Sequence, residues 1–412
     1  MRRDEMKGIL NRVGPAGFVE IIGLLLEGRD ETGKEIRKHR AEEFPLRALW
    51  EATVGPCEQT LPSQRSPGRF NYIEMQEALE STVFPSATGM LIASRIIEGY
   101  YGLEGAIGDQ LVTVMQSRLK SERIVGFTSL EGPKEVPEGM PYEESSFAEK
   151  YVTTETAKKG RILEITEEAI FHDQTGQILL RASRLGEATR QERELIILGG
   201  IVDVAGAADL VANGIKYRSV YRPNGTAAAL YSATNKNLAA GPIQLVDWTD
   251  LDEVFQYHAT TVRDDRARTD EQLPIIWMPK VLLVARKLWG TAARIANAIT
   301  VRSGDITAGT GMQFDTANPL GTLAPGLKPL SSPLLDYLAS LSGSQYNDSS
   351  DWFIGDPKAQ FIWQEIWPLQ TFRARQDDEA QFRRDVVARF KARYYGGIAA
   401  LDTVQLIKVN AA

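Results

Sequence analysis

The chain has 412 residues, of which 43% are hydrophobic and 25% are charged, so it has the composition of a folded globular protein with room for two structural lobes. Its formal net charge of -7 argues against a dedicated nucleic-acid-binding protein. The single cysteine, Cys57, excludes an intrachain disulfide, and no secretory signal is recognisable, so we expect folding in a reducing cytoplasm. The apolar stretches 21–26 and 196–204 are shorter than the ~20 residues that span a bilayer, which predicts no membrane role.

Residues 1–73 are expected to form a helical segment followed by an arm. Apolar residues recur at helical spacing from Phe18 to Leu26, and a polar, charged run follows from Arg29 to Glu43. Prolines and polar residues then indicate that residues 51–73 are extended. This stretch is either an arm that crosses onto a neighbouring molecule or a surface linker.

Residues 74–121 are predicted to be largely helical, with a break at Pro85. The expected core stripe consists of Met90, Leu91, Ile92, Ile96 and Ile97. Glycines then recur at intervals of three, a spacing that matches neither a dinucleotide-binding turn nor a phosphate loop. We expect helix packing or a helix end to explain these glycines, which are Gly99, Gly102, Gly105 and Gly108.

Residues 122–165 are expected to form a long polar hairpin. One side holds the β-favouring Ile124, Val125 and Phe127. The other side is expected to hold Tyr151, Val152, Ile162, Leu163 and Ile165. Prolines and glycines between the two sides withhold backbone donors, so the tip should project as an exposed loop. A lone hairpin is marginal in water, so this arm must be held by its own domain or by a neighbouring copy of the chain.

A long amphipathic helix is predicted over residues 166–204. Thr166 is a good N-cap, Glu167 and Glu168 place negative charge in the first turn, and no proline follows until Pro223. One face should pack, and the other, rich in arginine and glutamate, should meet solvent or partners. The expected packed face consists of Ile170, Ile178, Ala182, Leu185, Ala188 and Leu195.

Residues 205–370 mix strands, loops and short helices, one of which is expected from Lys280 to Ile299. In the closing segment, 371–412, apolar residues from Val386 to Ala392 alternate with basic ones, which predicts a strand with one buried and one basic face. Gly396 and Gly397 are expected to form a turn, and residues 404–409 are expected to form the partner strand.

The sequence offers no recognisable catalytic, cofactor or metal site. Its three histidines, His39, His172 and His258, are far apart, and no motif has the ligand spacing that a metal requires. His172 is better explained as a polar residue near the start of the long helix. Neither a GxSxG motif nor a nucleophile-base pair can be named. We therefore predict no enzyme activity, no cofactor and no metal.

The order of hairpin, return strand and long helix resembles the extended loop and spine helix of tailed-bacteriophage major capsid proteins of the Hong Kong 97 type. The resemblance rests on the string VPEGMPYEESSFAEKYVTTETAKKGRILEITEEAIFHDQTGQILLRASRLGEATRQERE. The closing string RRDVVARFKARYYGGIAALDTVQLIKV is similar to the final strands of that family. In related proteins the leading segment forms an arm or a portion that a protease removes.

The resemblance implies an α+β fold with an N-terminal arm, an extended loop, a peripheral domain that carries the spine helix, and an axial domain. Residues 1–73 would be the leading segment and arm, 74–121 the first part of the peripheral domain, 122–165 the extended loop, 166–204 the spine helix, 205–370 the axial domain and 371–412 the closing peripheral strands.

The same resemblance implies a structural protein of the virion capsid, made in the cytoplasm of a bacterial host. It would assemble through pentamers and hexamers into an icosahedral phage head around double-stranded DNA, without sequence-specific binding. A portal, a scaffold or protease, and decoration proteins are the implied further partners. Many modest interfaces between identical subunits would close the shell.

The inter-subunit contact is expected at the tip of the extended loop, at Pro133, Lys134, Glu135, Pro137 and Glu138. Exposed charge pairs there would each contribute only ~0–1 kcal/mol. Two alternatives stay open. One is the shell of an encapsulin-like protein compartment, and the other is a soluble cytoplasmic α+β enzyme, which a discrete small oligomer with a deep polar pocket would favour.

Overall fold

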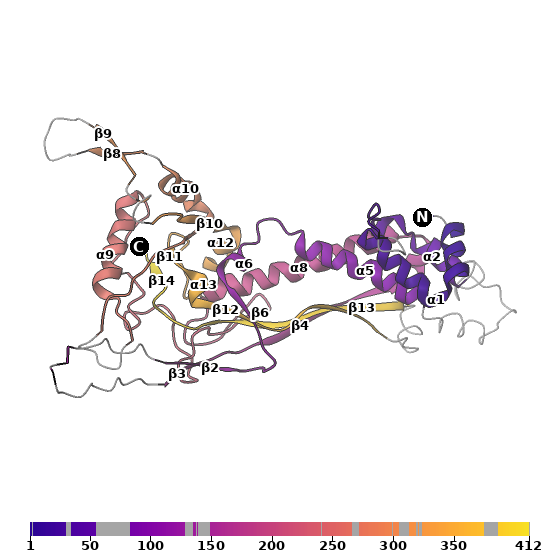
Figure 1. Ribbon diagram of the computed structural model, residues 1–412, viewed down its shortest axis with the longest axis horizontal. Helices are drawn as coiled ribbons and strands as arrows, with labels where there is room; N and C mark the ends of the chain where they lie inside the picture. The colour runs from indigo at the N-terminus through magenta and orange to yellow at the C-terminus, as the bar shows by residue number, and fades with distance from the viewer. Residues whose placement is uncertain are drawn as a thin grey trace. The chain divides into compact units, whose positions relative to one another are not determined.

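The computed structural model describes residues 1, 3–29, 34–54, 83–127, 135–136, 138, 149–239, 241–265, 272–298, 300–304, 313–318, 320, 324–374 and 386–411. These residues form an α+β fold (Figure 1). The helices are α1 (Arg3–Glu27), η1 (Ala41–Glu43), α2 (Leu46–Thr53), α5 (Val83–Tyr101), α6 (Gly108–Leu111), α7 (Glu167–Phe171), α8 (Thr175–Ile201), α9 (Trp248–Thr261), η4 (Arg286–Leu288), α10 (Trp289–Asn297), α12 (Pro333–Ala339) and α13 (Pro357–Gln360).

The strands are β1 (Thr113–Gln116), β2 (Arg123–Phe127), β3 (Glu149–Thr153), β4 (Ala157–Thr166), β5 (Leu210–Ala212), β6 (Ile215–Tyr217), β7 (Val281–Ala285), β8 (Thr300–Gly304), β9 (Gln313–Ala317), β10 (Lys328–Ser332), β11 (Trp352–Gly355), β12 (Phe361–Arg373), β13 (Val386–Ala400) and β14 (Leu406–Val409). Two four-stranded sheets have the orders β1-β12-β13-β4 and β10-β7-β11-β14. The pairs β2-β3, β5-β6 and β8-β9 form two-stranded sheets.

The chain divides into two compact units. Unit 1 consists of residues 1–104, 158–192 and 367–394, and unit 2 consists of residues 105–157, 193–366 and 395–412. Helix α8 and strands β12 and β13 contribute residues to both units.

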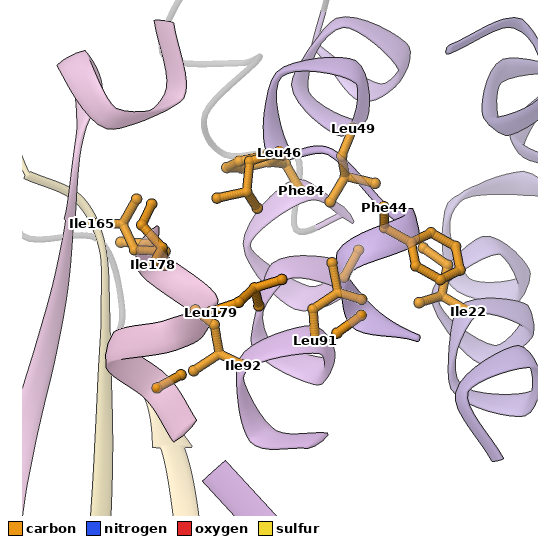
Figure 2. Packing of buried hydrophobic residues seen from close by; sticks show 14 of the residues in the cluster. Ile22, Phe44, Leu46, Leu49, Phe84, Leu91, Ile92, Ile165, Ile178 and Leu179 are labelled. Atoms are coloured by element: carbon orange, nitrogen blue, oxygen red, sulfur yellow. The ribbon is translucent and has the colours of Figure 1, made fainter. Parts of the chain in front are cut away.

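The core of unit 1 is built from helices that lie far apart in the sequence. Helix α1 packs against α2 and α5, and their apolar residues share one cluster with the first half of α8 (Figure 2). Phe44, Leu49 and Trp50 are each at most 1% exposed. The ring of Trp50 meets Phe84 edge to face at a centroid distance of 4.8 Å. Burial of one such large side chain stabilises the fold by about 1.5–3 kcal/mol.

Helix α1 is long and apolar enough to cross a membrane by length and composition. In the structure it is two helical pieces, because Gly14 has a φ of 77° and a ψ of 178° at a kink before Pro15. Met6, Phe18 and Ile22 of this helix are buried in the core of unit 1. These buried residues of α1 are therefore used in packing within the core of unit 1.

Helices α5 and α8 approach backbone to backbone. A Cβ atom at Gly186 would lie 2.1 Å from the carbonyl oxygen of Ile96, and one at Gly99 would lie 2.2 Å from that of Ser183. Only glycine fits at these contacts. Helix packing is thus confirmed as the explanation for Gly99. Gly186 allows the same close approach from the side of α8.

The long helix predicted from Thr166 is broken in two. Helix α7 ends at Phe171, and α8 begins at Thr175. Asp173, between them, has a left-handed φ of 47°, a conformation that aspartate tolerates better than most residues. The Asp173 carboxylate accepts a hydrogen bond from the Thr175 hydroxyl at 2.7 Å. His172 therefore follows α7 and is exposed, and does not lie within the long helix.

Two further predictions of secondary structure need correction. Ile162, Leu163 and Ile165 do not belong to the hairpin, because they lie in β4, which pairs with β13. Where one helix was predicted from Lys280 to Ile299, residues 281–297 form strand β7 followed by η4 and α10, so the α-helix begins only at Trp289. An apolar run such as 281–285 is ambiguous between a buried strand and a helix, and here it is a strand with every residue buried.

The closing strands also differ from the prediction. Strand β13 continues through Gly396 and Gly397 without a turn, and β14 pairs with β11. A Cβ atom at Gly397 would lie 2.5 Å from the carbonyl oxygen of Glu155, and one at Gly396 would lie 2.8 Å from that of Gln364. The two glycines are therefore needed for a close approach of neighbouring backbone, not for a reversal of the chain.

The core of unit 2 lies around the sheet β10-β7-β11-β14. Strands β7 and β10 are parallel, whereas β11 is antiparallel to both β7 and β14. The indole of Trp352 on β11 is fully buried and donates to the Ile243 carbonyl at 3.0 Å. Lys408 on β14 forms a buried ion pair with Asp351 at 3.0 Å. The Trp352 indole and the Lys408 ammonium group therefore each have a partner that offsets their loss of water.

Candidate assembly interface

The base of the predicted extended loop is a two-stranded antiparallel hairpin. Strands β2 and β3 pair from Arg123 with Thr153 to Phe127 with Glu149, as the sequence predicted for these residues. Below the hairpin, the Thr154 hydroxyl accepts from the backbone amide of Glu122 at 3.0 Å. Val125 is 57% exposed, so the hairpin has little core of its own.

The hairpin is held by its own unit. The Thr153 amide donates to the Arg222 carbonyl at 3.1 Å, and the Asn224 amide donates to the Tyr151 carbonyl at 3.0 Å. Lys150 forms an ion pair with Asp265 at 3.3 Å. Burial opposes the charge of Lys150, but the carboxylates of Asp402 and Asp265 outweigh burial and raise the pKa of this lysine. The sequence left open whether the hairpin is held by its own domain or by a neighbouring copy of the chain. The structure contains contacts that hold it on its own domain.

Two of the five predicted contact residues are described, and both face solvent: Glu135 and Glu138 are exposed. Pro133, Lys134 and Pro137 lie outside the described residues. The structure holds one chain, so the contact of these five residues with a neighbouring subunit stays a prediction.

Arg190 and Arg193 of α8, which were expected on the face that meets solvent or partners, are buried instead. Arg190 is 6% exposed and lies over the Tyr100 ring at 5.5 Å, whereas Arg193 is 7% exposed and pairs with Asp109 at 3.0 Å. Glu194 accepts from the Gly108 amide at 2.7 Å. Helical spacing alone could not indicate these partners, because all of them come from the segment around α5 and α6.

One face of the sheet in unit 1 carries an alternating series of cations and aromatic rings. We call it the cationic sheet face and define it as Lys158 of β4, Trp367 and Phe372 of β12, and Lys391 and Arg393 of β13. The Arg393 guanidinium lies 4.4 Å from the Trp367 centroid and 4.2 Å from the Phe372 centroid. Lys158 lies 5.6 Å from the first ring, and Lys391 lies 5.6 Å from the second.

The basic character of this face was predicted from the alternation in β13, and the alternation is confirmed: Ala388, Phe390 and Ala392 are buried in the core of unit 1. The aromatic partners were missed. Trp367 and Phe372 belong to β12, and no signal in their own strand indicates that they meet the cations of β13.

The three histidines lie in different surroundings. His39 is hydrogen-bonded to Glu43 at 2.7 Å on unit 1, His172 is exposed, and His258 is stacked on Trp277 in unit 2 at a centroid distance of 4.2 Å. Among the described residues, no group of three or more His, Cys, Asp and Glu side chains could hold a metal ion.

Comparison with known proteins gives one family and several solved structures. The model of the family described as "Phage capsid protein" matches residues 149–409. A search of curated proteins finds no match. Among solved structures, Mycobacterium phage Ogopogo is 16% identical, with 74% of this chain and 91% of that chain covered and a TM-score of 0.42.

Two further solved structures are similar to the chain. A capsid of a native GTA particle is 11% identical, with 75% of this chain and 91% of that chain covered and a TM-score of 0.46. A virus-like particle from Pyrococcus furiosus is 10% identical, with 77% of this chain and 98% of that chain covered and a TM-score of 0.38.

The family model spans more than half of the chain, from hairpin strand β3 through the long helix to the final strand β14. The described elements also follow the order of hairpin, long helix and closing strands that the Hong Kong 97 type requires. The chain belongs to the phage capsid protein family and is a structural major capsid protein of phage heads, not an enzyme.

Proposed function

We propose that the chain is the repeating subunit of an icosahedral head that closes through pentamers and hexamers around double-stranded DNA. The observation that carries this proposal is the hairpin β2-β3, which is hydrogen-bonded to its own unit at its base and yet has Arg123, Val125 and Glu149 exposed to solvent. A second subunit is the natural cover for such an arm. Contacts between unlike surfaces of identical subunits close into rings when the rotation between neighbours permits it.

The subunit contact that we propose lies at the loop tip, at Pro133, Lys134, Glu135, Pro137 and Glu138. Its support is chemical: the tip is rich in proline and glutamate, and the two described glutamates are exposed. We also propose that residues 205–370 act as the axial domain, and that residues 74–121, 166–204 and 371–412 act as the peripheral domain, with 1–73 as the leading arm and 122–165 as the extended loop.

Further partners follow from a head that must be filled and closed. A portal, a scaffold or protease, and decoration proteins are the classes of protein that we propose. The packaged DNA would be held without reading its sequence. With a net charge of -7 the subunit as a whole repels phosphate, so the wall would confine the DNA more than bind it.

Electron microscopy of the purified recombinant chain tests the proposal, with and without co-expressed neighbouring genes. We expect closed shells, or free rings of five or six subunits, and nucleic acid inside particles made in the presence of the packaging proteins. Shells filled with a protein cargo would instead favour an encapsulin-like compartment. A stable monomer or dimer under every condition would contradict the proposal.

A further inference from the structure

One face of helix α5 is left uncovered within unit 1. Its residues recur every three or four positions, which places them on a single side of the helix. All of them are half-buried or exposed, and Met90, Ile97 and Tyr101 are large apolar side chains that meet solvent. We call this face the α5 stripe and define it as Ser86, Gly89, Met90, Ala93, Ile97 and Tyr101.

A groove follows the α5 stripe. A hollow of about 400 Å³, lined by Val19 and Phe390, lies beside its first half. A second hollow of about 990 Å³, lined by Leu26 of α1, continues toward its end. Both hollows reach Met90 and Ala93, so they join into one groove. At about 1.5 Å per residue the stripe is about 22 Å long, and an apolar groove of this kind fits the apolar face of an amphipathic helix.

Cations outnumber carboxylates on the rim of this groove. The exposed cations that line it are Arg29, Lys38, Arg40 and Arg373. Among the described residues, two glutamates line it as well, Glu27 and Glu98, and Glu98 already pairs with Arg95 at 2.8 Å. Because opposite charges select the partner of a surface, the groove favours a helix whose polar face is acidic.

The chain carries a segment of this chemistry directly before α5. Residues 72–80, with the sequence YIEMQEALE, lie outside the described residues. Their spacing predicts an amphipathic helix, because Tyr72, Met75 and Leu79 fall on one face. The segment holds three glutamates and no lysine or arginine, which gives it a net charge of -3. Two of the glutamates, Glu74 and Glu80, fall at the two edges of the apolar face.

The connection to α5 is too short to carry this segment far away. Ser81 and Thr82 alone separate it from Val83, the first residue of α5. Helices joined by about two to five residues lie antiparallel and side by side. A tether of this length also raises the effective concentration of the segment at the groove. Nine helical residues extend about 13 Å, which covers the apolar half of the groove beside Met90.

We propose that residues 72–80 dock as an amphipathic helix in the groove along the α5 stripe of the same chain. The docked segment shields the apolar groove from water, and its edge glutamates face the cationic rim. The inference goes beyond the proposed function, because it concerns one chain and requires no shell. The expected antiparallel pairs are Leu79 with Ser86, Met75 with Met90 and Tyr72 with Ala93.

Engineered disulfides in the full chain test the docking, with Cys57→Ser as the background. Met75→Cys/Met90→Cys should form a disulfide within one chain under oxidised glutathione. Glu77→Cys/Met90→Cys is the matched control, since Glu77 falls on the opposite face of the predicted helix. The first pair should react about tenfold faster or more, because a disulfide requires facing Cβ atoms and a Cα distance below about 7 Å. Non-reducing gels and intact mass distinguish bonds within a chain from bonds between chains.

A second pair makes the test independent of one position. Leu79→Cys/Ser86→Cys should react as fast as the first pair, and Glu77→Cys/Ser86→Cys is its control. Thermal melting of the free subunits checks that each variant folds. If the variants at Met90 do not fold, the pair at Ser86 replaces them in the same comparison.

Charge reversal tests the role of the rim. Added to the first cysteine pair, Glu74→Lys/Glu80→Lys should slow disulfide formation by about threefold or more, because like charges then meet at the groove. Glu74→Asp/Glu80→Asp keeps the charge and should stay within about twofold of the unmodified pair.

Three outcomes would overturn the inference. Equal rates for a pair and its control would show that the segment does not dock by its apolar face. Disulfides formed mainly between chains would assign the groove to the segment of another copy. An unchanged rate after charge reversal would remove the cationic rim from the contact. Free subunits suffice for all three measurements, so none of these results bears on the proposed function, which the absence of shells and rings alone would contradict.

Discussion

At the scale of single residues, Gly186 is the described glycine of unit 1 at which an added Cβ atom would have the closest neighbour. We expect Gly186→Ala to lower the free energy of unfolding by about 1–3 kcal/mol, because the added methyl group must push α5 away from α8. The nearest obstacles are backbone atoms, the Ile96 carbonyl oxygen at 2.1 Å and the Tyr100 nitrogen at 2.8 Å. Neither can move without its helix. Chemical denaturation of free subunits measures the change.

Gly176 in the same helix provides the matched control. A Cβ atom there would meet nothing within 4 Å. Gly176→Ala should therefore leave stability unchanged or raise it by up to about 1 kcal/mol, since alanine is the better helix former. Equal effects of the two substitutions would show that helix propensity, and not the close approach, determines the result.

His258 is expected to make the stability of unit 2 depend on pH. Burial lowers the pKa of its imidazole below the ordinary value, against an opposing hydrogen bond to the Val404 carbonyl. The folded state therefore favours the neutral ring. Stability should be fully present above about pH 6.5, the unfolded pKa, and should decline as the pH falls through the folded pKa.

His258→Phe tests this pH dependence, because phenylalanine keeps a ring on Trp277 and cannot be protonated. Thermal melting is compared between neutral and mildly acidic pH. The loss of melting temperature on acidification should be smaller in the variant than in the natural chain. An equal loss in both proteins would assign the acid sensitivity to other groups.

At the scale of elements, α9 begins with a reciprocal cap. The Asp247 side chain accepts from the Trp248 amide at 2.7 Å, and Asp250 accepts from the Asp247 amide at 2.8 Å. Asp247→Ala should cost about 0.5–2 kcal/mol, because the first amides of the helix lose their acceptor. Amide hydrogen exchange should quicken in the first turn of α9.

Asp252→Ala is the control for this cap, since Asp252 lies in the same helix and accepts only a side-chain hydrogen bond from Gln256 at 2.8 Å among its described contacts. Its removal should change exchange by much less. If both variants exchange alike, the cap does not hold the start of the helix.

The elements that could be predicted from the sequence are those with local signals. The hairpin β2-β3 follows from β-favouring residues around proline-rich turn chemistry, and α8 follows from its long apolar periodicity. The break at Asp173 was missed, because one aspartate, although it favours turns and caps, does not by itself mark a break within a long apolar periodicity. The run 281–285 shows the same limit, since an apolar stretch does not reveal whether its neighbours are strands.

The candidate site was predictable only in part for a similar reason. Charge alternation in β13 revealed a basic face from one strand alone. The rings that order those charges come from β12, so they become visible only when the two strands are placed side by side. The core stripe expected on α5 was also only partly correct, because Met90 and Ile97 are 36% and 45% exposed.

At the scale of the whole molecule, the leading helices are part of the fold that the long helix needs. The Leu46 amide donates to the Thr175 hydroxyl at the start of α8 at 2.7 Å. We expect Trp50→Ala to cost about 3–5 kcal/mol, because a fully buried indole leaves a cavity between α2 and α5. Hydrogen exchange should then quicken in α5 and in the first half of α8. Arg47→Ala removes a half-buried side chain that pairs with Glu51 at 3.1 Å and leaves no cavity in the core, so it should quicken exchange in both helices much less.

This shared core has a consequence for whether the leading segment can be removed by a protease during maturation of the head. A protease that cut after residue 54 would strip Phe18, Phe44 and Trp50 from the cluster and leave Phe84, Leu91 and Ile178 facing water. Removal of the leading segment would thus expose the apolar core of unit 1 to water. The mass of the subunit in finished, DNA-filled heads should accordingly equal that of the entire chain, and a shorter polypeptide in mass spectrometry would contradict this expectation.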